Sequence, residues 1–190
     1  MKIMKALVGS CLLAVMPLAA QAADGMSYSY VDLGYNEIDI DGAPSGDGLG
    51  LRGSIGFAEN FFAFAEYANF GFPASVDVDV YSVGLGGRLG VSDRVDLVGR
   101  VGYTEADFSA GGFSADADGY LVSAGVRAEV AEGFELEGSV IYSDYGSSGG
   151  DDTELAVGGR YFFTENFAAG AEFRTGDDAD TIFVGVRFAF

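Results

Sequence analysis

Apolar and polar residues alternate one by one along nearly the whole chain after residue 22. In "LGLRGSIGF", Leu49, Leu51, Ile55 and Phe57 fall on one side, and small residues with one arginine fall on the other. The same pattern recurs in "YSVGLGGRL" (81–89), "YLVSAGVRAEV" (120–130) and "LAVGGRYFF" (155–163). A period of two indicates β-strands, because successive side chains of a strand point to opposite faces. No later segment has a convincing helical period, so the pattern predicts an all-β protein.

Two kinds of separator alternate between these runs. Four are short: 59–60, 92–94, 132–133 and 165–166. Five are long, acidic and rich in Gly or Ser: Asp39–Asp47, Asn69–Asp77, Ala106–Asp118, Tyr145–Asp152 and Gly176–Asp180. They predict ten strands near 26–37, 48–58, 61–69, 78–90, 95–105, 118–130, 134–145, 153–163, 167–175 and 180–190, with eight strands as the alternative.

The composition of the two faces indicates which one points outward. The face opposite the apolar residues is Gly, Ser and Ala with isolated charges, which suits a crowded lumen better than a solvated exterior. Aromatic residues of the apolar face form one band beside the short turns (Phe57, Phe61, Phe134, Phe163, Phe167, Phe190) and one toward the long loops (Tyr67, Tyr103, Tyr120, Tyr142, Phe173). Two such bands are typical of transmembrane β-barrels. We therefore expect a closed antiparallel transmembrane barrel with short periplasmic turns and longer acidic extracellular loops. A soluble sandwich or lipocalin-like barrel is the alternative.

The first 22 residues have a different character. Lys2 and Lys5 precede an apolar run from Ala6 to Met16, and Ala20-Gln21-Ala22 provides a small-residue cleavage site. This pattern predicts a secretory signal peptide over 1–22 and a single barrel domain over 23–190. An uncleaved anchor, or a lipoprotein modified at Cys11, is the alternative.

Charge and composition narrow the function. Loss of Lys2 and Lys5 changes the net charge from −19 to −21 and leaves no Lys, Cys, His or Trp. So acidic a protein does not suit nucleic acid as a partner. Without His, Cys or Lys, the usual general bases and nucleophiles are absent, so we expect no catalytic residues and no enzyme activity. An enzyme using acid pairs such as Glu135 with Glu137 is a weaker alternative.

Metal and cofactor signals are equally thin. "DIDGAPSGDG" (39–48) and "GDDADT" (176–181) offer carboxylates, but the first lacks the spacing and the final Glu of an EF-hand loop. "GLGLRG" is no dinucleotide motif, because no helix follows it. The sequence therefore predicts no metal site and no cofactor.

These features together resemble a known group of proteins. The signal peptide, even strand count, short turns, acidic loops and Phe-terminated last strand are similar to those of the small outer-membrane barrels of the OmpA/OmpX-like class. "YSVGLGGRLGVSDRVDLVGRVGY" resembles the small acidic barrels known as quorum factors or activators of plant immunity. Ten strands departs from the eight of OmpA and OmpX. The resemblance implies that the terminal "VGVRFAF", with Phe188 and Phe190, is read by the barrel-assembly machinery.

The charges on the inward face predict a plugged lumen. The alternation places one Arg inward on each descending strand and acids, with one further Arg, on the ascending ones. The expected network comprises Arg52, Arg88, Arg100, Arg127, Arg160, Arg187, Glu66, Asp96, Glu135, Glu137 and Glu172. Most lie near a short turn or the C-terminus, so they should meet in the periplasmic half, where Arg–carboxylate pairs satisfy both partners.

The function that fits is a non-enzymatic surface-structural or interaction role in the bacterial outer membrane, with a small-solute, porin-like channel as the alternative. We expect a monomer that contacts outer-membrane lipids and lipopolysaccharide. The acidic loops should repel this anionic leaflet unless divalent cations bridge the two. The residues expected to bind these cations are Asp39, Asp41, Asp47, Asp151, Asp152, Asp177, Asp178 and Asp180.

Overall fold

The computed structural model describes residues 26–190, apart from the side chains of Ser147 and Ser148. The expected signal peptide and Cys11 lie outside these residues. The strands are β1 Tyr30–Ile40, β2 Gly46–Ala58, β3 Phe61–Phe72, β4 Val76–Ser92, β5 Val95–Ala110, β6 Phe113–Ala131, β7 Phe134–Asp144, β8 Asp151–Phe162, β9 Phe167–Thr175 and β10 Ala179–Ala189. One short helix, α2 (Gly146–Gly149), lies between β7 and β8. No helix in the described part is long and apolar enough to cross a membrane.

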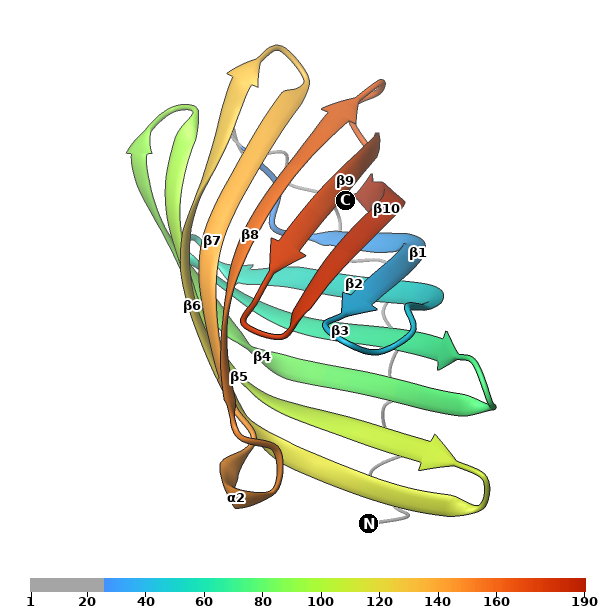
Figure 1. The fold of residues 1–190 in the computed structure, drawn as a ribbon. Coiled ribbons are helices and arrows are strands. Elements are labelled where there is room, and N and C mark those ends of the chain that lie inside the picture. Colours follow the sequence, from blue (N-terminus) through green and yellow to red (C-terminus); the bar gives the residue numbers. More distant parts are fainter. Residues whose placement is uncertain (1–25) are drawn as a thin grey trace.

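The ten strands form one closed antiparallel barrel (Figure 1), which confirms the predicted fold class and strand count. Each strand pairs with its neighbours in sequence, and β10 returns to pair with β1 from Tyr30↔Ala189 to Ile40↔Ala179. At the end of this seam, the Phe190 amide donates a 2.9 Å hydrogen bond to the Ser29 carbonyl. Closure gives every strand two neighbours, as a sheet in lipid requires.

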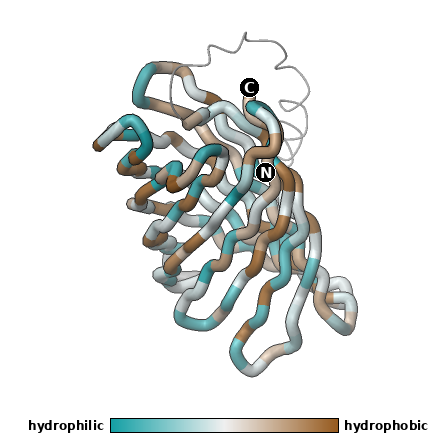
Figure 2. The backbone as a smooth tube through the Cα atoms, turned by 90° about the horizontal axis from the view of Figure 1, so that it is seen from above, coloured by the Kyte–Doolittle hydropathy of each residue, from teal (hydrophilic) through white to brown (hydrophobic). Residues whose placement is uncertain are grey.

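The barrel has its apolar side chains outside and its charges inside. Leu49, Leu85 and Leu89 are 62%, 56% and 65% exposed, whereas Arg127 and Arg187 are 2% and 6% exposed. Figure 2 shows hydrophobic and hydrophilic positions alternating along the strands. This arrangement rules out the soluble alternative, in which the apolar face would form the core.

The prediction of a long loop over 106–118 is wrong. Residues 106–118 are mostly strand: β5 and β6 pair as far as Ala110↔Phe113 around a two-residue turn. Gly111 and Gly112 have φ of 54° and 89°, values that favour glycine and suit the type I′ turn of a tight hairpin. The acidic composition suggested a loop, but Asp and apolar residues alternate across this segment, and that alternation is a strand pattern.

β4, β5 and β6 are the longest strands, with 17, 16 and 19 residues. β3 extends beside β4 toward the extracellular side, since their pairing runs as far as Phe72↔Val76. The segment 69–77, expected as a long loop, is thus reduced to 73–75 between the two strands. The four strands stay paired beyond the tyrosines of the outer aromatic band, as far as Phe72↔Val76 and Ala110↔Phe113.

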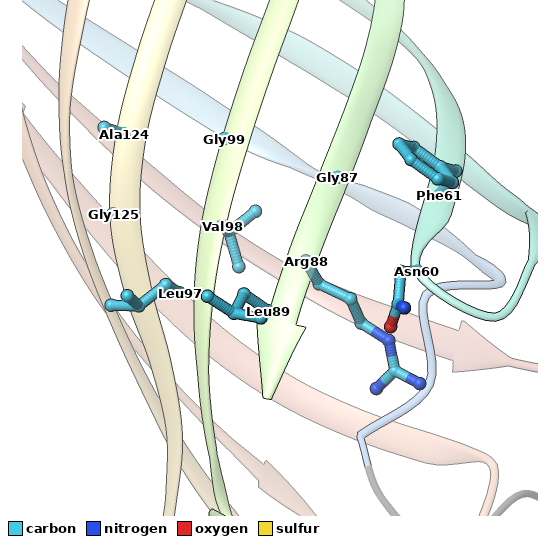
Figure 3. A pocket seen from close by; sticks show the side chains of 10 residues that line it. All are labelled: Asn60, Phe61, Gly87, Arg88, Leu89, Leu97, Val98, Gly99, Ala124 and Gly125. Atoms are coloured by element: carbon cyan, nitrogen blue, oxygen red, sulfur yellow. The ribbon is translucent and has the colours of Figure 1, made fainter. Parts of the chain in front are cut away.

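The outer wall carries one shallow hollow of about 420 Å³ toward the periplasmic end (Figure 3). Gly87, Gly99 and Ala124 lie side by side in the register of β4, β5 and β6. Their small side chains leave space between Phe61 and the leucines Leu89 and Leu97, which also line it.

Candidate functional site: the charged lumen

The candidate site is the set of charged side chains that point into the barrel. Alternation places the eleven residues predicted to be luminal on the inward face of nine strands, β2 to β10, so the site is assembled from segments that are far apart in sequence. Each of the eleven residues assigned to the lumen from the sequence makes an ion pair inside the barrel. Nine luminal residues, one of them not foreseen, join into a single alternating series of Arg and Glu.

The series begins on β6, β7 and β8. Arg127 donates from Nε and Nη2 to Oε2 of Glu135, at 3.0 and 2.7 Å. The same carboxylate accepts from Arg160 Nη1 at 3.1 Å, and Arg160 Nη2 donates to Glu137 at 2.9 Å. Two carboxylates on one strand face are therefore both engaged by guanidinium groups.

The series continues across the lumen. Arg100 on β5 contacts Glu137 at 3.4 Å and Glu66 of β3 at 3.2 Å. Glu66 then meets Arg174 of β9 at 3.7 Å, and Arg174 Nε donates to Glu172 at 2.7 Å. The last link is Arg52 of β2, which lies 2.9 Å from Glu172.

Arg174 and Asp32 are luminal charges that the sequence reasoning missed. Arg174 joins Glu66 to Glu172, and its position two residues after Glu172 on the same strand face could have revealed it. Asp32 pairs with Arg187, whose Nε and Nη2 lie 2.6 and 2.7 Å from its two oxygens. Asp32 shares the inward phase of Tyr30, two residues before it. It lies opposite Arg187 in the register that closes the barrel.

The segment before β1 enters the periplasmic end of the lumen. Arg127 Nη1 donates to the Ser27 carbonyl at 2.8 Å, and Ser54 donates to the Tyr28 carbonyl at 2.7 Å. The Tyr28 hydroxyl donates to Asp96 at 2.9 Å. Burial raises the pKa of the Tyr28 phenol, so the hydroxyl keeps its proton and remains a donor to Asp96.

The Tyr28 ring also contacts two luminal arginines. It lies 4.9 Å from the Arg127 guanidinium and 5.2 Å from that of Arg88, within the range of cation–π attraction. Arg88 pairs with Asp96 at 3.4 Å. Segment 26–29 thus lies inside the periplasmic end of the barrel, in contact with the luminal charges.

One small void lies among these side chains. The void beside Asp32, Arg52 and Arg187 measures about 30 Å³, room for about one water molecule. In the described part, Arg187 Nη1 is the buried side-chain nitrogen or oxygen without a hydrogen-bond partner. Its guanidinium carbon lies 3.4 Å from the centre of the Tyr30 ring, so the ring stabilises the cation by a cation–π contact.

The described residues contain no group of three or more His, Cys, Asp or Glu arranged to hold a metal ion. Of the eight aspartates expected to bind bridging cations, Asp41, Asp177 and Asp178 lie in connections between strands, and the other five lie at strand ends. Their binding of bridging cations stays a prediction.

The sequence also matches a known protein family. Residues 8–155 match the model of the outer membrane protein beta-barrel domain. The chain belongs to this family. It is therefore a bacterial outer-membrane protein that crosses the membrane with the strands described above.

The chain is also similar to solved structures, at low sequence identity. The KdgM porin is 14% identical, with 85% of this chain and 99% of that chain covered and a TM-score of 0.47. Ail, the attachment invasion locus protein of Yersinia pestis, is 20% identical, with 87% and 100% covered and a TM-score of 0.43. A bacterial polysaccharide outer membrane secretin is 11% identical, with 87% and 67% covered and a TM-score of 0.50. No curated protein matches the sequence.

The two residues expected to guide assembly lie at the closing seam. Phe188 packs against Phe167 with ring centres 5.0 Å apart and against Phe190 at 6.1 Å. They form an aromatic cluster at the periplasmic rim. Recognition of this end by the assembly machinery stays a prediction.

Proposed function

We propose that this outer-membrane protein has a non-enzymatic, surface-structural or interaction role and that its lumen is closed to solutes. The observation that carries the proposal is the continuous series of nine alternating Arg and Glu side chains from Arg127 to Arg52. Pairing stabilises each buried charge, so removing any member would expose its partner to an unfavourable environment. The void of about 30 Å³ beside Asp32, Arg52 and Arg187 is too small to hold a solute, which supports the proposal.

The same network supports the absence of catalysis. Glu135 and Glu137 are the acid pair that could have served as acid and base, and each accepts hydrogen bonds from arginine. Carboxylates already hydrogen-bonded to guanidinium groups are not free to exchange a proton with a substrate.

Conductance of the purified protein in planar bilayers tests closure. The wild type should give no steady current. Arg174→Ala, which separates Glu66 from Glu172, should give frequent openings, whereas Arg94→Ala in an exposed periplasmic turn should behave like the wild type. Altered gel mobility of unboiled samples would verify that each variant is folded. Stable, voltage-independent channels from the wild type would favour the porin-like alternative instead.

A further inference from the structure

The outer end of β6 has an open edge. β6 pairs with β5 along its length up to Phe113, but its pairing with β7 begins only at Tyr120↔Asp144. Residues 113–119 therefore have no strand on their second side. This is the longest such stretch in the described barrel, and its first four residues are exposed.

The turn geometry shows which backbone groups face this edge. In a two-residue hairpin the residues flanking the turn, here Ala110 and Phe113, form a hydrogen-bonded pair, and bonded and non-bonded pairs then alternate. Residues 113, 115 and 117 consequently bond to β5. Ser114, Asp116 and Asp118 direct their N–H and C=O groups toward the side without a strand. Gly149 of α2 lies close to Ala117, and Asp144 and Tyr145 lie beside Gly119, so the edge is most open from Phe113 to Asp116.

The outer face of this sheet is acidic, and its rows of charge end at the open edge. Asp79, Asp107 and Asp116 lie directly opposite one another on β4, β5 and β6. In the next row, Glu105 lies opposite Asp118. Like charges at opposite positions repel each other, so a cation placed beside Asp116 and Asp118 would be stabilised.

The inner face of the same sheet is apolar. Val78, Phe108 and Ala115 form one row across β4, β5 and β6, and Val76, Ala110 and Phe113 form the next. Phe113 is 64% exposed and lies at the end of its row. A strand added at the edge would thus meet carboxylates on one face and apolar side chains on the other.

We propose that the edge Phe113–Gly119 binds an extended polypeptide segment in which basic and apolar residues alternate, as an added strand. The backbone of the segment pairs with Ser114, Asp116 and Asp118, its basic side chains lie beside the two aspartates, and its apolar side chains cover Phe113 and Ala115. A second copy of this chain fits poorly, because its own acidic rows would face these. The inference rests on the interaction role proposed above and names its partner class.

A synthetic peptide of alternating Lys and Val tests this with the protein in nanodiscs of zwitterionic lipid. Binding should be saturable, weaken as salt is added, and be absent from empty nanodiscs. A peptide with Glu in place of Lys, and one with the same composition in separate Lys and Val blocks, should each bind at least about tenfold more weakly. Equal binding of either control peptide would refute the proposed pairing.

One pair of variants tests backbone pairing, and one double variant tests the attraction between charges. Ser114→Pro removes an outward N–H and should abolish binding, whereas Ser114→Ala keeps it and should bind like the wild type. Asp116→Asn with Asp118→Asn should lower affinity about tenfold and reduce its salt dependence. If Ser114→Pro fails to fold, the double Asn variant decides alone, since unchanged affinity there excludes the acidic edge.

Hydrogen exchange identifies the edge directly. The peptide should slow exchange of the amides of Ser114, Asp116 and Asp118 while leaving 113, 115 and 117 unchanged. Protection elsewhere, or dimers of the peptide-free protein in sedimentation, would overturn the inference. If the protein does not conduct and does not bind the peptide, the proposed binding edge is refuted and the closed lumen is retained. If the protein binds the peptide but conducts ions, only the closed lumen is refuted.

Discussion

Carboxylates of the lumen and carboxylates of the outer β4–β6 sheet occupy opposite environments in one barrel. In the lumen, Glu135, Glu137, Glu66 and Glu172 each lie within 4 Å of at least one arginine. On the sheet, Asp79, Asp107 and Asp116 face one another across neighbouring strands. Inside, an unpaired charge would be destabilising by several kcal/mol, whereas water screens the outer rows. Burial, rather than residue type, decides whether a carboxylate must have a cationic partner.

Loss of one luminal acid should have the largest effect. Glu135→Gln removes the charge shared by Arg127 and Arg160, and we expect unfolding free energy to fall by about 3–5 kcal/mol. Denaturant titration in micelles, followed by circular dichroism and gel mobility, measures it. The matched outer change Asp116→Asn should shift stability by less than about 1 kcal/mol. Equal losses of stability at both sites would show that burial does not decide how strongly a carboxylate depends on its partner.

A charge moved to the lipid-facing wall should have an intermediate effect. Val101 is 57% exposed and lies near the middle of the β5 span. Val101→Arg should destabilise the folded protein by about 2–4 kcal/mol, and Val91→Arg near the periplasmic turn by about 0–1 kcal/mol. Refolding into lipid vesicles at graded denaturant concentrations gives both values. Depth-independent values would show that this wall does not face the membrane as described.

The smallest effect should come from the outer sheet, with the opposite sign. Asp107→Asn removes the middle charge of a row, so stability should rise by about 0.2–1 kcal/mol at low ionic strength. Added salt should shrink the gain, because screening already weakens the repulsion in the wild type. Thermal unfolding at two salt concentrations measures this. A loss of stability would mean that Asp107 makes a favourable contact stronger than the repulsion.

Much of the barrel could be predicted because alternation fixes the phase of a strand. Once Leu85 and Leu89 are assigned to the outside, Arg88 must point inward. Which charges meet could not be predicted in the same way. Arg52 reaches Glu172 on β9, with β1 and β10 between their strands, and that contact depends on side-chain reach across a narrow lumen. Arg174 is a different case, because its spacing of two from Glu172 on β9 would have placed it in the lumen.

The outer hairpin shows a different kind of failure. Residues 106–118 combine strand alternation with the composition of a loop, and composition was given more weight. Gly111-Gly112 between two alternating runs is a hairpin signal, and its positive φ values show why both positions are glycine. The edge that this hairpin leaves open on β6 could not be inferred, since it depends on β7 ending at Asp144.

The β1–β10 seam has a consequence for how the molecule reaches its native state. The other nine pairings join consecutive strands, so each forms over a short stretch of chain, but Tyr30 and Ala189 are separated by nearly the whole sequence. Bringing them together carries the loop-closure entropy of the entire domain, and contacts of such high contact order form slowly. Until they form, β1 and β10 each have an unpaired edge in a medium without water. Completion of the seam should therefore be a late, all-or-none step whose barrier sets the folding rate.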